Sequence, residues 1–235
     1  MNPPLFALPK FLLRYKFQKD HSLVYTLKIK VTHNLNHYGV KKTSRHDIDF
    51  LVSMKTLKVE KKGNAVVLFR ILSGGWKVNG KLRKANFQSR FSFLVNPFGQ
   101  VIKSSFKGFK KELFLFQTPP FPLTLRSNWK VKKKLLIPEL NLPLIFMARM
   151  NIKSYEKTDN GNESVVILSR FFGRSSKRFP YKSSLKGKSN ILFDITYGFI
   201  RQSALALEIK SKVSDRIGTI LSHHYKVSIK IGLNQ

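Results

Sequence analysis

The chain has 235 residues, with 44 Lys and Arg against 12 Asp and Glu, so its formal net charge is +32 at pH 7. A hydrophobic fraction of 42% with 20 Phe is enough for a folded core, which excludes a disordered basic tail. The absence of Cys excludes disulfides, thiolate nucleophiles and thiolate metal ligands, and it leaves the redox compartment open.

The first segment, residues 1–20, is predicted to be a basic apolar arm. Pro3, Pro4 and Lys10 interrupt the apolar run that a signal peptide needs, so we do not expect one in this numbering. Residues 5–17 could be helical, and the arm could thread into an assembly, lie on a membrane or pack on its own sheet. No apolar stretch approaches the roughly 18 residues of a transmembrane helix.

Alternation of apolar and polar residues dominates the rest of the chain and predicts β-strands, because successive side chains of a strand point to opposite faces. The alternating runs are 23–31, 48–54, 87–95 and 221–231, and the runs that are apolar on both faces are 65–72 and 165–168. The second kind is typical of strands that are covered on both sides.

Turn signals with Gly or Asn separate these runs, at 62–64, 73–75, 79–80, 96–99 and 159–162. No window of a dozen residues has a clear helical stripe, although 214–221 could form a short helix. We therefore predict an all-β protein with antiparallel sheets of about ten to twelve strands. Two duplicated halves, half-barrel-like or sandwich-like, are one arrangement that fits this pattern.

A Pro-containing segment at 112–140 is expected to connect a first β half, 21–111, to a second β half, 141–235. Each half contains a pattern of strand, turn, Gly and strand, at 91–102 and 191–200. The spacing from Phe to Gly differs by one residue between them, so duplication and independent formation of similar hairpins both stay open.

The Pro-rich stretch, the Trp that follows it and the two Gly-closed hairpins resemble a bacterial secreted family described only as a domain of unknown function. In that family a Gly-Asp-x-Trp turn follows the Pro-rich stretch, whereas here Trp129 is kept and the preceding Arg126, Ser127 and Asn128 replace the rest. The resemblance spans residues 21–232, and the high positive charge departs from the family. It implies an envelope β-protein, placed in the bacterial periplasm or cell envelope if a presequence has been removed, and it supplies no catalytic residues.

Residues 75–81 match the spelling GxxxxGK of a phosphate-binding loop. Such a loop needs Ser or Thr next, where this chain has Leu82, and it needs a helix whose N-terminal amides hold the phosphate. Trp76 is also bulky for the inside of that turn. We interpret the match as a hairpin loop.

The histidines and paired aspartates give no convincing catalytic or metal site. His33 and His37 have helical zinc spacing, but no helix pattern surrounds them and a strand would hold them ~13 Å apart, so we predict solvated loop histidines. His223 lies on an apolar strand face and is predicted to be a hydrogen-bonded core histidine. Asp47 and Asp49 would lie ~7 Å apart on one strand face, where nearby lysines favour charge balance over catalysis. We therefore expect no catalytic residue, metal or cofactor.

The positive charge is the strongest feature of the chain, because it recurs in almost every segment and its field attracts polyanions. Phe171 and Phe172 lie among these charges and could stack on bases, although Phe in a β-protein is first a core residue. A Lys-rich proteome with uniformly basic surfaces is the alternative explanation. The candidate contacts to a polyanion or acidic partner are Lys107, Lys110, Lys111, Lys130, Lys132, Lys133, Lys134, Arg170, Arg174, Lys177 and Arg178.

From these patterns we expect a non-enzymatic, strongly basic binding or scaffold protein. It would dock on an acidic protein or anionic polymer within a larger bacterial envelope or filament assembly. An RNA-binding ribosomal or other nucleoprotein component is the alternative, because RNA phosphates would account for the same charge.

Overall fold

The computed structural model describes residues 10–83, 90–105, 117–137, 142–175, 181–214 and 219–234. These residues form twelve β-strands and no helix, which confirms the predicted all-β class. The strands are β1 (Ser22–His37), β2 (Val40–Val59), β3 (Ala65–Val78), β4 (Lys81–Arg83), β5 (Arg90–Val95), β6 (Val101–Ser104), β7 (Asn128–Ile137), β8 (Leu142–Lys157), β9 (Glu163–Arg174), β10 (Tyr181–Asp194), β11 (Phe199–Ser214) and β12 (Thr219–Asn234). No helix in the described ranges is long and apolar enough to cross a membrane.

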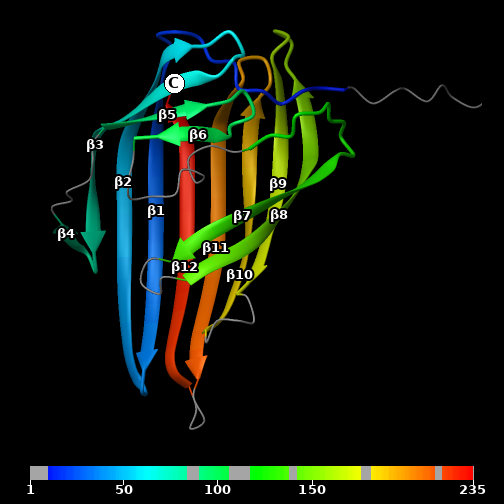
Figure 1. Cartoon of the computed structure of the whole chain (residues 1–235). Coiled ribbons are helices and arrows are strands. Elements are labelled where there is room, and N and C mark those ends of the chain that lie inside the picture. The colour runs from blue at the N-terminus through cyan, green and yellow to red at the C-terminus, as the bar shows by residue number, and fades with distance from the viewer. Residues whose placement is uncertain are drawn as a thin grey trace, which may run out of the picture.

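All twelve strands belong to one antiparallel sheet, which does not close on itself. Its order is β6-β5-β3-β2-β1-β12-β11-β10-β9-β8-β7, with β4 paired to β3. The two expected halves are thus parts of a single sheet, joined where β1 pairs with β12. Figure 1 shows that the sheet is strongly curled, with β5 and β6 from one edge and β7 and β8 from the other crossing in front of the long strands.

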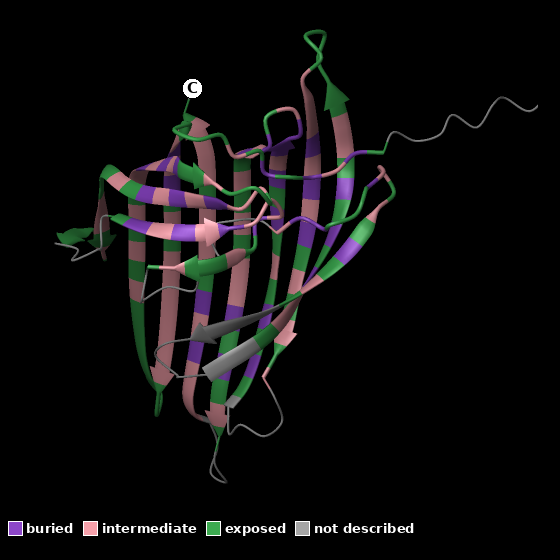
Figure 2. Cartoon of the chain, turned by 45° about the horizontal axis from the view of Figure 1, so that its top comes forward, coloured by how far each residue is buried: buried purple, intermediate pink, exposed green. Residues whose placement is uncertain are grey.

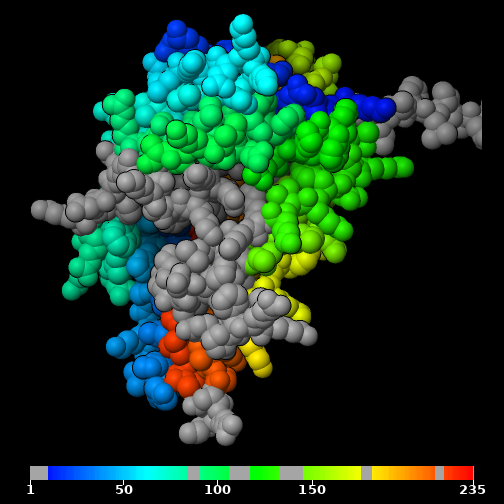
Figure 3. Space-filling view, in the orientation of Figure 1, coloured from blue at the N-terminus to red at the C-terminus, as the bar shows by residue number. Residues whose placement is uncertain are grey.

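The curl encloses an apolar core on one face of the sheet. Along β1, for example, Tyr25 and Leu27 are buried while Lys28 and Lys30 are exposed, as alternation requires. We call the face that carries the buried residues the inner face and the opposite face the outer face. Figure 2 shows that the buried positions gather mainly toward one end of the sheet. Figure 3 shows β5 and β6, in green, covering that end.

The N-terminal segment 10–17 packs inside this curl and is extended, so the predicted helix is wrong for these residues. Phe11, Leu13 and Tyr15 are buried in alternation, which is the pattern of extended backbone. Phe11 and Leu123 exchange two backbone hydrogen bonds, of 2.9 and 2.8 Å, so the segment is paired with the Pro-containing connection. Of the three placements predicted for the arm, packing on its own sheet is the one observed for 10–17, while residues 1–9 lie outside the described ranges.

One turn and one helix that the sequence suggested are not found in the described residues. The predicted turn at 73–75 lies within β3, where Gly74 has a φ of +124° and a Cβ there would lie 2.0 Å from the carbonyl oxygen of Asp49. Glycine is required at this position because a side chain would collide with the backbone of the neighbouring strand β2. The helix considered for 214–221 is also wrong where it is described, because Ser214 ends β11 and Thr219 begins β12.

The hairpin interpretation of 75–81 is confirmed. This stretch is the end of β3, a two-residue turn and the start of β4. Asn79 and Gly80 have φ values of 51° and 80°, the positive values that a tight hairpin turn needs.

Candidate functional site

Directly opposite residues of adjacent antiparallel strands point to the same face, so the strand register defines which charges meet. One row of outward positions crosses nine strands from β3 to β7. Its members, in order, are Lys77, Asp47, Lys30, Ser228, Ala206, Lys188, Arg170, Arg149 and Lys130. We call this line of residues the basic row.

The basic row ends in four consecutive cations, Lys188, Arg170, Arg149 and Lys130, on four neighbouring strands. All four are exposed, and no carboxylate within the described ranges forms an ion pair with any of them. Neighbouring strands are about 4.8 Å apart, so each cation has a like charge beside it. Like charges directly opposite each other destabilise a sheet, which makes this line a place where an anion would be stabilising.

A parallel line of outward positions lies beside the basic row, and we call it the second row. Its members are Lys132, Met147, Phe172, Lys186, Glu208, Lys226, Thr32 and Arg45. It carries four cations, one acid and one exposed aromatic ring, with 40% of Phe172 accessible. The guanidinium carbon of Arg149 lies 5.0 Å from the centroid of the Phe172 ring, within the range of a cation–π contact.

The negative charge of Glu208 is already balanced by neighbouring side chains. Its carboxylate pairs with Lys186 at 2.8 Å, Lys210 at 3.3 Å and His224 at 2.8 Å. The hydrogen bond from Lys186 is the main cause that lowers the pKa of Glu208 to about 2, with Lys210 and His224 acting in the same direction and burial opposing them. Glu208 therefore stays ionised at neutral pH and leaves a net positive surface around it.

The two rows border a hollow of about 900 Å³ on the outer face. Its lining includes the outward residues of both rows on five strands, β1, β12, β11, β10 and β9, and Ala206 and Ser228 leave it open because their side chains are small. A second hollow of about 530 Å³ adjoins it and is lined by Arg174 and Lys210 among others. Phe172, Lys186 and Glu208 line both hollows and so stand at their shared boundary.

The structure brings some of the predicted contact residues together. Lys130 and Arg170 lie in the basic row, Lys132 lies in the second row, and Arg174 lines the smaller hollow. In β7, Lys133 and Lys134 pair in register with Phe146 and Ile145. The remaining predicted contacts lie outside the described residues, and they are Lys107, Lys110, Lys111, Lys177 and Arg178.

Sequence reasoning missed Lys30, Arg149, Lys186, Lys188 and Lys226 as members of one surface. Each occupies a polar position of an alternating strand, so its outward direction was readable from the sequence. Their common surface depends on the register of strands that are far apart in the chain, which alternation does not specify.

The prediction of solvated loop histidines is wrong for His33. His33 lies in β1 on the inner face, its Nε2 is 3.0 Å from Nδ1 of His223, and its ring stacks on Tyr225 at 4.1 Å. His223 is buried and hydrogen-bonded, as predicted, whereas His37 is exposed at the end of β1. Across the described ranges, no three His, Cys, Asp or Glu side chains are arranged to hold a metal ion.

Asp47 and Asp49 face cations on the outer face. The Asp49 carboxylate lies 3.6 Å from Nζ of Lys28, and Asp47 is flanked in register by Lys30 and Lys77. This arrangement balances charge on an exposed surface, as expected from the sequence.

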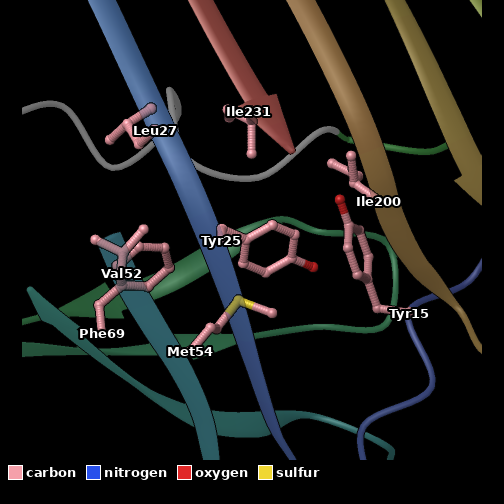
Figure 4. Close-up of a pocket in the computed structure, with 8 residues that line it drawn as sticks. All are labelled: Tyr15, Tyr25, Leu27, Val52, Met54, Phe69, Ile200 and Ile231. Carbon is pink, nitrogen blue, oxygen red and sulfur yellow. The ribbon is translucent and has the colours of Figure 1, made fainter. Parts of the chain in front are cut away.

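The apolar cavity on the inner face is small. Its volume is about 40 Å³, too little for an organic ligand. Burial among these apolar side chains raises the pKa of Tyr25 well above its usual value. The lining residues, drawn in Figure 4, are Tyr15, Tyr25, Leu27, Val52, Met54, Phe69, Ile200 and Ile231. The outer face, not this cavity, is thus the candidate functional site.

No family model and no curated protein matches the chain. Among solved structures, the chain is similar to DynF from the dynemicin biosynthesis pathway of Micromonospora chersina, with 8% sequence identity. That alignment covers 97% of this chain and 86% of the other, with a TM-score of 0.22. A score of this size does not establish a shared fold.

Proposed function

We propose that the protein is a non-enzymatic binding or scaffold component that docks through its outer face on an acidic partner in a larger assembly. The observation that carries the proposal is the run of four neighbouring cations, Lys188, Arg170, Arg149 and Lys130, without carboxylate partners in the described ranges. A bound polyanion would remove the repulsion between them and release its own counterions, and both effects favour association.

The chemistry of the face sets the class of partner. An acidic protein or anionic polymer of an envelope or filament assembly would supply carboxylates or other anions, and RNA in a nucleoprotein would supply phosphates. Either partner would be recognised mainly by charge, so the affinity should fall steeply with salt concentration.

A pair of triple variants with the same net charge tests this proposal. The first, Arg149→Gln with Arg170→Gln and Lys188→Gln, removes three cations of the basic row. The matched control, Lys41→Gln with Lys61→Gln and Lys62→Gln, removes three exposed cations elsewhere. Binding of labelled polyglutamate and labelled single-stranded RNA would be followed by fluorescence anisotropy over a series of salt concentrations.

The proposal predicts that at least one polyanion binds the wild-type protein and that the basic-row variant binds it more weakly than the control. For RNA, the slope of log affinity against log salt should fall by ~2 when three phosphate contacts are lost. Equal weakening in the two variants would show that only total charge matters, and would overturn the assignment of the site.

A further inference from the structure

We infer that the hollow beside Phe172 is a binding site for single-stranded nucleic acid, with a base stacked on Phe172 and phosphates held by Arg170 and Lys188. This inference rests on the proposed function and names the partner of the same face. Three features of the outer face carry it: an exposed ring, the cations around it and the shape of the hollow.

Phe172 is an exposed aromatic ring among the cations of the two rows. Its chain neighbour Phe171 points inward and packs against the core, so the two phenylalanines have different roles. Phe172 stands where the two hollows meet, and Arg149 holds the ring by a cation–π contact while 40% of the residue stays accessible. A positioned, accessible ring beside Arg is the arrangement on which unpaired bases stack.

The cations near the ring match the backbone of a nucleic acid strand. Lys186 is the direct register partner of Phe172, and Lys188 and Arg170 lie in the next row, bordering the same hollow. The basic row carries one cation per strand over its last four strands, or about one per 4.8 Å, and so forms a continuous line of positive charge beside the ring. Glu208 is the one acid that lines the hollow within the described residues, and its carboxylate pairs with Lys186, Lys210 and His224.

The hollow leaves room for a base beside Phe172. Ala206 and Ser228 are outward positions with small side chains, so space remains between the flanking Lys and Arg side chains. The hollow is wide, at about 900 Å³, and open to solvent, so a base can reach Phe172, whereas an acidic peptide would need only the cations at the rim. The ring and the hollow together therefore favour nucleic acid over an acidic protein.

The test compares strands with and without bases at constant charge. The probes are a labelled oligouridylate of about 12 nucleotides, an abasic strand with the same number of phosphates, and a polyglutamate of similar charge. The variants are Phe172→Ala and, as a control, Phe121→Ala, because Phe121 is 49% exposed in the connection between β6 and β7.

The wild-type protein should bind the base-bearing strand about tenfold more tightly than the abasic strand, the change expected from one base stack. Phe172→Ala should remove this preference and leave the abasic affinity unchanged, which also shows that the variant is folded. Phe121→Ala should keep the preference.

The outcomes separate this inference from the proposed function. If the wild-type protein binds both strands equally, if Phe172→Ala keeps the preference, or if polyglutamate binds more tightly than the base-bearing strand, the nucleic-acid site is wrong while polyanion binding stands. If none of the three probes binds at low salt, the proposed function fails together with the inference.

Discussion

Arg170 of β9 lies directly opposite Arg149 of β8, so two guanidinium groups of one sheet face sit on neighbouring strands. Lys188 and Lys130 extend the same line on either side, and both are also exposed. Stability alone does not favour such a line, because alternating charges would cost less. An anion bound to this face in the functional state would explain the arrangement.

Replacing Arg170 with Gln should stabilise the free protein at low salt. The variant removes the central repulsion of the basic row, so we expect the free energy of unfolding to rise by about 0.2–1 kcal/mol. The gain should shrink as salt screens the remaining charges. Urea unfolding at low and high salt measures both effects.

Arg126→Gln is the matched control for Arg170→Gln. Arg126 is exposed in the connection that precedes β7 and lies outside both rows, so its replacement should change stability little at either salt concentration. A loss of stability in Arg170→Gln at low salt would contradict a repulsive row.

Glu208→Gln should separate the stabilising role of the acid from its effect on binding. The folded pKa of about 2 is below the ordinary value of 4.5, so the ionised carboxylate stabilises the fold fully above pH 4.5. This contribution is lost as the pH falls from 4.5 through 2. The difference in unfolding free energy between wild type and Glu208→Gln should therefore be constant above about pH 5 and vanish toward pH 2.

The same Glu208→Gln variant should bind single-stranded RNA more tightly at neutral pH, because it removes the acid that lines the hollow. Glu60→Gln serves as a control, since Glu60 is exposed at the β2–β3 turn away from the rows. Unchanged RNA affinity in Glu208→Gln would indicate that the strand does not reach the hollow.

The alternation of β8 shows how far the sequence could predict this site. Arg149 stands between the buried Ala148 and Met150, so its outward direction follows from the sequence alone. The pairing of Arg149 with Arg170 depends on the register of the β8–β9 hairpin. This register shifts by a bulge between Ile152 and Ser154. A bulge of one residue changes every later pairing, and no local sequence pattern fixes its position.

The N-terminal segment is the opposite case. Its sequence contains the alternation of a strand, yet it was interpreted as a possible helix. Phe11, Leu13 and Tyr15 alternate as in a strand, yet the apolar character of the segment also suggested a helix. The extended form is stabilised by partners distant in sequence, Leu123, Pro97 and Gly198, through backbone hydrogen bonds. Such pairing cannot be derived from the segment itself.

Gly198→Ala should destabilise the protein by loosening the N-terminal segment. Gly198 has a φ of +70°, and a Cβ there would lie 2.4 Å from the backbone nitrogen of Lys16. The positive φ alone costs roughly 1–2 kcal/mol, and the steric clash adds to it because backbone atoms must move. Urea unfolding measures the total loss of unfolding free energy. Faster proteolysis after Arg14 or Lys16 would show that the N-terminal segment is the part that loosens.

Gly161→Ala is the control for the steric part of that cost. Gly161 has a similar φ of +77°, but no atom lies within 4 Å of a Cβ built there. It should show the conformational cost without the clash and without faster cleavage near Lys16. Equal destabilisation by the two variants would mean that the N-terminal segment does not clash with a side chain at position 198.

Leu13→Ala tests whether the N-terminal segment is part of the core. Leu13 is fully buried in the main hydrophobic cluster, so its truncation should lower the free energy of unfolding by about 2–5 kcal/mol. Leu82→Ala, at a β4 position that is 71% exposed, should change it by less than about 0.5 kcal/mol. A small effect at Leu13 would mean that the stability of the curled sheet does not depend on the packing of this segment.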